Sequence, residues 1–173
     1  MTNLLMRRPN LTGLPSLPAL PTTCLLRPTI ETDAPALAAV LRRAFVDGTW
    51  TADRVQAELL GDETVTQTLV VEREGEIIAT ASVRLLPERF PASGYLHWVA
   101  VDSAHQGQRL GYFVSLAVLH EFERLGCLDA VLETQDHRIP AIKTYLALGF
   151  RPEHTDETHL SRWAAIMESG VKP

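Results

Sequence analysis

The sequence has few of the features that identify several protein classes. Its 173 residues include two cysteines, Cys24 and Cys127, which form neither a disulfide framework nor a metal-ligand spacing. We therefore expect free thiols in a reducing cytoplasm. No apolar run approaches the roughly 20 residues that cross a bilayer, so no membrane segment is expected. Pro9 follows Arg7 and Arg8 in place of an apolar stretch, which argues against a secretory signal.

The chain also has no excess of basic over acidic residues. The chain has 16 Lys and Arg residues against 21 Asp and Glu residues, a net charge of −5. The first 30 residues contain three arginines and no acid, so the remainder of the chain carries a net charge of −8. Nonspecific binding to nucleic acid requires a basic face. We therefore expect neither a nucleic-acid partner nor, without an apolar span, a membrane partner.

The remaining composition is that of a globular protein, with 46% apolar and 21% charged residues. Residues 1–22 stand apart, because they show no helical or strand period and contain Pro9, Pro15, Pro18 and Pro21. We predict a proline-rich, extended N-terminal arm over residues 1–22 and a single domain over residues 23–173. The arm is either a disordered tail or a segment that packs on the domain or on a partner.

The spacing of apolar residues and the turn residues between them predict the elements of the domain. Strands are predicted at residues 24–27, 66–72, 76–85, 94–101, 128–133, 150–154 and 159–166. Helices are predicted at residues 34–45, 52–60, 111–125 and 140–148. This order favours an α/β (α+β) fold, with a mixed, mostly antiparallel sheet of six to seven strands and helices on both faces. One parallel crossover runs through the helix at residues 111–125.

One strand-loop-helix segment has the chemistry of an anion site. Its loop reads Gln106-Gly-Gln-Arg-Leu-Gly111, and backbone N–H groups of such a loop can join the free N–H groups of the following helix. Gly107 and Gly111 leave room for a phosphate, and Gln106, Gln108 and Arg109 add side-chain donors. The Gly-Lys-Ser/Thr ending of a P-loop and the Gly-x-Gly-x-x-Gly dinucleotide fingerprint are absent. A pyrophosphate group fits this loop.

This loop and a later helix together resemble the GNAT superfamily of N-acetyltransferases over about residues 23–166. The loop matches the superfamily's Gln/Arg-x-x-Gly-x-Gly/Ala motif, with Arg109 in place of the middle glycine. The helix matches Ala-x-x-x-Tyr-x-x-x-Gly-Phe through Ala141, Tyr145, Gly149 and Phe150. The predicted order of strands and helices is also the order of that superfamily.

The resemblance implies an acyltransferase of the EC 2.3.1 class that moves an acetyl group from acetyl-CoA to an amine acceptor, without a metal. It implies that the strand before the loop diverges from the next parallel strand and offers backbone groups to the pantetheine arm and the acetyl carbonyl. Arg138 stands where the family often has an asparagine that contacts the pantetheine arm. The implied acetyl-CoA-binding residues are Val99, Ala100, Val101, Gln106, Gly107, Gln108, Arg109, Leu110, Gly111 and Arg138.

The resemblance also implies two catalytic residues. Tyr145 matches the family's acid, whose phenol protonates the departing CoA thiolate; the alternative is a tyrosine that only packs against the sulfur. Strand alternation places Tyr95, His97, Val99 and Val101 on one side, and Leu96, Trp98 and Ala100 on the other. His97 is then the best-placed base for the amine proton, and the alternative is a hydrogen-bonded structural histidine. Trp50 and Trp163 either wall the acceptor pocket or are ordinary core residues.

Several questions stay open at the level of sequence. The acceptor is an amine of a small molecule or of a protein. An alternative to the enzyme is a module of the same fold that binds acyl-CoA without turnover, as a sensor or interaction domain. The sequence does not decide between a monomer and a homodimer. We expect the arm before residue 23 to be dispensable for catalysis, because the motifs all lie beyond it.

Overall fold

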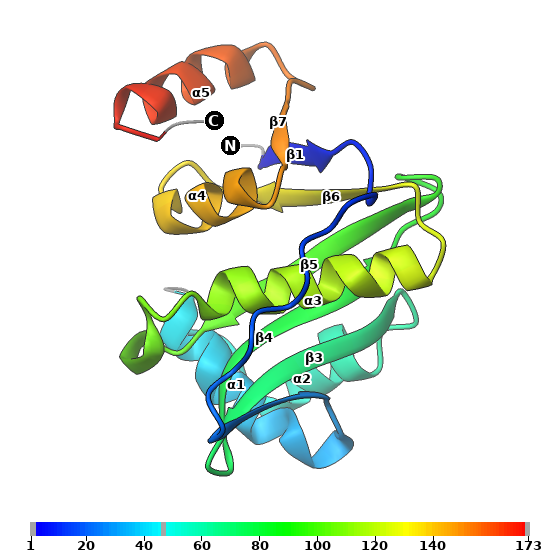
Figure 1. Ribbon diagram of the computed structural model, residues 1–173, viewed down its shortest axis with the longest axis vertical. Helices are drawn as coiled ribbons and strands as arrows, with labels where there is room; N and C mark the ends of the chain where they lie inside the picture. Colours follow the sequence, from blue (N-terminus) through cyan, green and yellow to red (C-terminus); the bar gives the residue numbers. More distant parts are fainter. Residues whose placement is uncertain (1–2, 46–47, 172–173) are drawn as a thin grey trace.

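The computed structural model describes residues 3–45 and 48–171, which form one seven-stranded sheet with the strand order β2-β3-β4-β5-β6-β1-β7 (Figure 1). All neighbouring strands are antiparallel except β5 and β6, which are parallel. The predicted mixed sheet is therefore confirmed. The strands are β1 (Leu4–Arg8), β2 (Cys24–Pro28), β3 (Val65–Arg73), β4 (Glu76–Leu85), β5 (Ser93–Val101), β6 (Asp129–Thr134) and β7 (Arg151–Glu153).

Helices cover both faces of this sheet, as expected. In Figure 1, α3 crosses in front of β4 and β5, whereas α1 and α2 lie behind the sheet. Thr51 begins α2, since its hydroxyl accepts a hydrogen bond from the backbone N–H of Arg54. The helices are α1 (Ala34–Ala44), α2 (Ala52–Val55) with the π-helical turn η2 (Gln56–Leu60), α3 (Leu110–Arg124), α4 (Ile139–Ala147) and α5 (Thr158–Glu168), and the 3-10 turns are η1 (Glu31–Asp33) and η3 (Ser103–His105).

Two core clusters hold the layers together. The larger cluster packs the apolar side of α3 against the sheet, with Val114, Leu116 and Phe122 wholly buried. The second packs α1 and α2 against the opposite face, around Leu37 and Leu41. Burial of each such side chain stabilises the fold by about 1.5–3 kcal/mol. The sheet is thus covered by helices on both faces, and its strand ends carry the loops.

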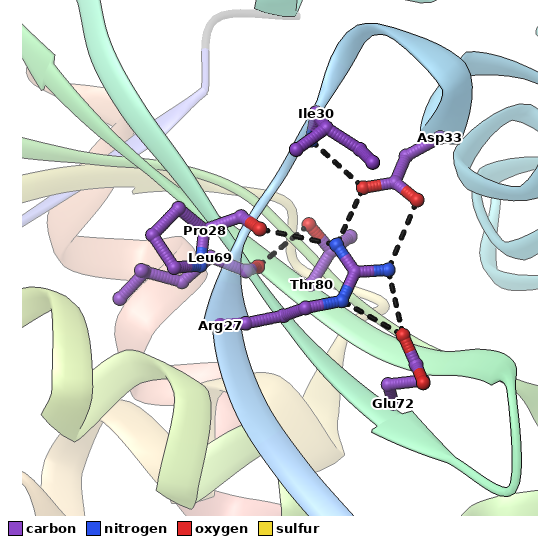
Figure 2. Close-up of polar contacts among 7 residues, drawn as sticks. All are labelled: Arg27, Pro28, Ile30, Asp33, Leu69, Glu72 and Thr80. Atoms are coloured by element: carbon purple, nitrogen blue, oxygen red, sulfur yellow. Dashed lines mark hydrogen bonds and ion pairs between the residues drawn. The ribbon is translucent and has the colours of Figure 1, made fainter.

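A polar network fixes the start of α1 to the sheet, and Figure 2 shows its contacts. Arg27 of β2 donates to both carboxylate oxygens of Asp33, at 2.6 and 3.0 Å, and to Glu72 of β3 at 2.7 Å. Asp33 also accepts from the backbone N–H of Ile30 at 2.9 Å. The hydrogen bonds from Arg27 hold the pKa of the Asp33 carboxyl below its usual value. The network joins β2, β3 and α1 through paired charges.

A β-bulge in β5 changes which residues share a face. The pairing of β5 with β4 skips one residue of β4 but two of β5, because His97 lies opposite Ser82 while Ala100 lies opposite Thr80. Trp98 occupies the bulge with φ of 43°. As a result, Leu96 and Val99 both pack with the α3 cluster, whereas Trp98, which was predicted to share a face with Leu96, packs with the α1–α2 cluster. The alternation predicted from the sequence was therefore wrong beyond His97, because a bulge inserts one residue and shifts the phase.

The final strand predicted at residues 159–166 was wrong, since these residues belong to helix α5. His159, Trp163 and Ile166 are the buried residues of α5, and their spacing of four and three is helical. The sheet position beside β7 is taken by β1 from the N-terminal segment instead.

The prediction of an arm without strand structure was also wrong for residues 4–8. Strand β1 forms register pairs with β6 from Leu4 to Arg8 and with β7 from Leu5 to Arg7. The chain then runs across α3 to β2 (Figure 1), and the carbonyl of Pro15 lies 2.9 Å from a ring nitrogen of His120. A domain boundary at residue 22 stays a prediction.

Candidate functional site

Strands β5 and β6 diverge after a short parallel ladder. Their register covers Ser93–Tyr95 and Asp129–Val131, whereas β5 stays paired with β4 as far as Val101. Beyond Tyr95, the backbone of β5 therefore has no strand partner in β6 within the described chain. Val99, Ala100 and Val101, which were predicted to offer backbone groups, lie on this part of β5, whose edge toward β6 has no strand partner. We call this feature the strand divergence.

The predicted anion loop follows β5 directly. Asp102 begins it by accepting from the backbone N–H of Ala104 at 2.9 Å and by forming an ion pair with Arg43 of α1. Gly107 has φ of 79°, and Arg109, with φ of 58°, directly precedes α3. Successive residues of such conformations turn N–H groups toward one point. The first turn of α3, directly after the loop, has free N–H groups of its own, so the anion site stays a prediction for this segment.

Two residues of the loop bear on its fit to a phosphate. Arg109 adopts the left-handed conformation that the family's glycine would adopt more easily, and its guanidinium lies 5.1 Å from the ring centre of Tyr112. A Cβ added at Gly111 would meet only Val101, at 3.6 Å, which is an ordinary contact. Packing within the protein therefore does not require glycine at residue 111. Gln106 and Gln108 lie in the loop between η3 and α3, and Leu110 is the first residue of α3.

Arg138 connects the two sides of the strand divergence. It directly precedes α4, and its Nε donates to Oε1 of Gln135 at 3.3 Å. Its guanidinium also lies 4.3 Å from the ring centre of Phe45. Phe45 ends α1 and packs beside β5, whereas Arg138 follows β6. The predicted pantetheine-contacting position is thus at the divergence, held between α1 and α4.

Tyr145 lies in α4 with 7% of its surface exposed. Its ring meets the Phe150 ring edge-on at 6.1 Å between centres. Burial raises the pKa of the Tyr145 phenol to about 12, against a smaller opposite effect of the Arg138 charge. The phenol is therefore protonated at neutral pH, which is the form that an acid requires.

His97 is bound by an arginine. Nη1 of Arg84 lies 3.1 Å from Nε2 of His97, and because guanidinium has only donors, Nε2 must accept. The neutral ring then carries its proton on Nδ1. Burial, and secondarily the charge of Arg84, lowers the pKa of His97 to about 3. This arrangement favours the structural alternative for His97, because the basic lone pair is already engaged.

Glu133 is a partly buried acid near the strand divergence that the sequence analysis did not consider. It lies on β6 beyond the last β5–β6 pair and accepts hydrogen bonds from the hydroxyl of Tyr95 at 2.8 Å and from Arg89 at 2.7 Å. Burial raises the pKa of its carboxyl, but the contacts with Arg89 and Tyr95 outweigh burial and leave that pKa lowered. The signal in the sequence was an acid, Glu133, directly after the apolar run Ala130–Leu132 of the same predicted strand.

An aromatic cluster lies on the α1–α2 side of the bulge. Trp98 meets Phe45 and Trp50 edge-on, with ring centres 5.3 and 4.6 Å apart. Trp50 is wholly buried and backs this cluster, whereas Trp163 belongs to the core cluster around α3. Of the two tryptophans considered for an acceptor pocket, Trp50 contacts Trp98 in the β5 bulge, and Trp163 is buried in the α3 cluster.

Two features are absent from the part of the chain that the structure describes. In residues 3–45 and 48–171, no group of three or more His, Cys, Asp or Glu side chains is arranged to hold a metal ion. None of the helices described is long and apolar enough to cross a membrane.

Comparisons with known proteins point to one family. The sequence profile of the "Acetyltransferase (GNAT) family" matches residues 35–150. The mycothiol acetyltransferase of Nocardia farcinica is 35% identical over 74 residues, which are 43% of this chain and 24% of that protein. N-acetyltransferase 8B of Rattus norvegicus is 35% identical over 86 residues, or 47% of this chain and 38% of that protein. The chain therefore spans less than half of the length of these relatives.

Solved structures show the same arrangement. The GNAT family N-acetyltransferase YhbS of Escherichia coli, in complex with CoA, has a TM-score of 0.60 and 28% identity, covering 78% of this chain and 71% of that one. The ribosomal-protein-S18-alanine N-acetyltransferase of Escherichia coli has a TM-score of 0.65 and 23% identity, covering 76% and 79%. The second likeness concerns the fold alone.

Proposed function

The chain belongs to the acetyltransferase (GNAT) family, and from that premise we propose that it transfers an acetyl group from acetyl-CoA to an amine acceptor. One observation carries the proposal. The unpaired end of β5 leads directly into the loop before α3, and Tyr145 lies in α4, which follows the diverging strand β6. In this proposal, the loop would hold the cofactor, the β5 edge facing away from β4 would offer backbone groups, and Tyr145 would donate the proton.

Acetyl-CoA is the proposed co-substrate. Its pyrophosphate would bind the loop Gln106–Gly111, where backbone N–H groups and the first turn of α3 favour an anion. Arg138 would contact the pantetheine arm from the other side of the divergence, because its guanidinium already lies there over Phe45. The CoA complex of YhbS supports this reading of the fold.

The transfer itself would use backbone and phenol groups of this chain. The amine nitrogen attacks the thioester carbon, so that a C–N bond forms as the C–S bond breaks. An N–H from Val99–Val101 aimed at the developing oxyanion would contribute roughly 3–4 kcal/mol. CoA leaves as a thiolate, and the protonated phenol of Tyr145 supplies its proton.

The proton of the amine needs a separate acceptor. Glu133 is our candidate, because it is ionised at neutral pH and lies on β6 just beyond the divergence. His97 is the weaker candidate, since Arg84 occupies its one basic lone pair, on Nε2, whereas the carboxylate of Glu133 keeps acceptor capacity beyond its hydrogen bonds from Arg89 and Tyr95. Protonation of the amine is the main obstacle, as an amine of pKa about 10.4 is almost wholly charged at pH 7.

A small-molecule or protein amine in the cytoplasm is the proposed acceptor, with no metal, nucleic acid or membrane involved. The engaged lone pair of His97 favours a second candidate function, an acyl-CoA-binding module without turnover, because a binder needs no base. An enzyme releases free CoA when acetyl-CoA and an acceptor amine are present, whereas a binding module does not.

Turnover of acetyl-CoA with a panel of amines tests the proposal. We expect CoA release above the amine-free rate with at least one acceptor. Tyr145→Phe removes one oxygen and should lower kcat by roughly 10- to 1000-fold, with little change in acetyl-CoA affinity. Acetyl-CoA binding without turnover would favour the sensor, and absence of binding would contradict both functions.

A further inference from the structure

We infer that Arg8, in the N-terminal strand β1, positions Tyr145 by holding the C-terminal end of α4. This inference rests on the proposed role of Tyr145 in acetyl transfer. It assigns a role in the site to the segment that the sequence analysis set apart as an arm.

The contact is direct and short. Nη1 of Arg8 donates to the carbonyl oxygen of Leu148 at 2.5 Å. Leu148 directly follows α4, and its own N–H donates to the carbonyl of Tyr145 at 3.1 Å. Arg8 therefore reaches the backbone of Tyr145 through one intervening residue.

Gly149 makes room for this guanidinium. Its φ is 82°, and a Cβ added there would lie 2.4 Å from Nη1 of Arg8, which is too close for two non-bonded atoms. The next N–H, of Phe150, donates to the carbonyl of Tyr145 at 3.0 Å. The Gly-Phe pair of the family motif thus accommodates Arg8 and closes the helix end at Tyr145.

Charge and burial favour the same arrangement. A helix carries partial negative charge at its C-terminal end, so a guanidinium stabilises it there. Strand β1 is itself held firmly, because Leu4 and Met6 are wholly buried in the core cluster that also contains Tyr145 and Phe150. Arg8 is therefore a rigid support for α4.

Arg7 provides a matched control within the same strand. It forms ion pairs with Asp129 of β6 at 2.8 Å and with Glu153 of β7 at 2.6 Å. None of its recorded partners lies in α4. Loss of Arg7 should weaken the anchoring of β1 without touching the end of α4.

The test compares Arg8→Met, Arg8→Lys and Arg7→Met in the full chain. Arg8→Met keeps the apolar stem but removes the donor, and we expect kcat to fall by about 10-fold, as small misplacements of a reacting group do. The KM for acetyl-CoA should change little. Arg8→Lys should restore part of kcat, and Arg7→Met should retain wild-type kcat even where its melting temperature falls.

A double variant separates positioning from general destabilisation. In a Tyr145→Phe background, Arg8→Met should cause little further loss of kcat, because the group that it positions is already missing. A full additional 10-fold loss in that background, or an equal loss in Arg7→Met, would overturn the inference. Unchanged kcat in a folded Arg8→Met variant would overturn it as well.

Amide hydrogen exchange provides a readout that does not depend on activity. Exchange at residues 145–150 should be faster in Arg8→Met than in wild type and Arg7→Met. If wild-type protein releases no CoA with any amine, the proposed function fails, and exchange alone then decides the support of α4 by Arg8. Equal exchange in all variants contradicts that support, whatever the activity.

Discussion

Arg84 of β4 and His97 of β5 are diagonal neighbours across the strand pair, with Nη1 of the arginine 3.1 Å from Nε2 of the histidine. The arginine carries a second partner, Asp62, whose carboxylate lies 3.2 Å from Nη2. The histidine is thereby kept neutral and fixed in one tautomer. Its imidazole behaves as a polar structural group with a free N–H, and that behaviour has measurable consequences.

Stability should fall with acidification partly through His97. The pKa of His97 is lowered to about 3 in the folded protein, against about 6.5 in an unfolded chain. The unfolded state thus binds more protons between these values, so the contribution is present above about pH 6.5 and is lost as pH falls. His97→Gln should reduce the slope of unfolding free energy against pH between pH 6.5 and 4, measured by urea unfolding. An unchanged slope would contradict the buried neutral histidine.

The proton acceptor should be identified by the pH dependence of kcat. If Glu133 takes the amine proton, Glu133→Gln should lower kcat most at low pH, and the defect should shrink as pH approaches the pKa of the amine. His97→Gln should lower kcat by a similar factor at every pH at which it stays folded. The reverse pattern would return the base role to His97.

Binding of acetyl-CoA should depend on the surface at Gly111. Gly111→Glu places bulk and negative charge at the proposed pyrophosphate site and should abolish binding in calorimetry. Gly111→Ala is the matched control for folding, because the added Cβ meets only Val101 at 3.6 Å. Glutamate in the first turn of a helix is also favourable to that helix. Wild-type affinity in folded Gly111→Glu would refute the site.

Removal of Arg27 should destabilise the fold strongly. Asp33 is only 8% exposed, so Arg27→Met leaves a buried carboxylate without its cation, at a cost of about 3 kcal/mol. Arg124→Met is the control, because Arg124 and Glu121 form an exposed pair worth at most about 1 kcal/mol. If urea unfolding showed equal losses of unfolding free energy in Arg27→Met and Arg124→Met, the network of Figure 2 would contribute little to stability.

Local patterns predicted most of the fold and part of the site. The glycines and apolar spacing around α3 predicted the proposed anion loop, and the role proposed for Tyr145 was predicted from its motif. The bulge at Trp98 was not predicted, because a tryptophan with positive φ has no signature in the sequence. The failure at α5 was avoidable, since His159, Trp163 and Ile166 have helical spacing.

Strand β1 and Glu133 escaped prediction for a different reason. Five residues with two adjacent arginines show no clear strand period, and the partners of β1 are remote: Arg7 and Glu153 are 146 positions apart. The importance of Glu133 likewise arises from Tyr95 and Arg89, on other segments. Both features depend on contacts between residues far apart in the sequence, which local sequence patterns do not predict.

The place of β1 in the sheet sets the order in which the protein can be completed on the ribosome. Leu4–Arg8 is synthesised before both of its neighbours, β6 and β7. At about 5–20 residues per second, this apolar segment waits on the order of ten seconds for its partners. The prolines that follow it favour an extended chain, and the sheet cannot close at β1 until β6 and β7 have been synthesised.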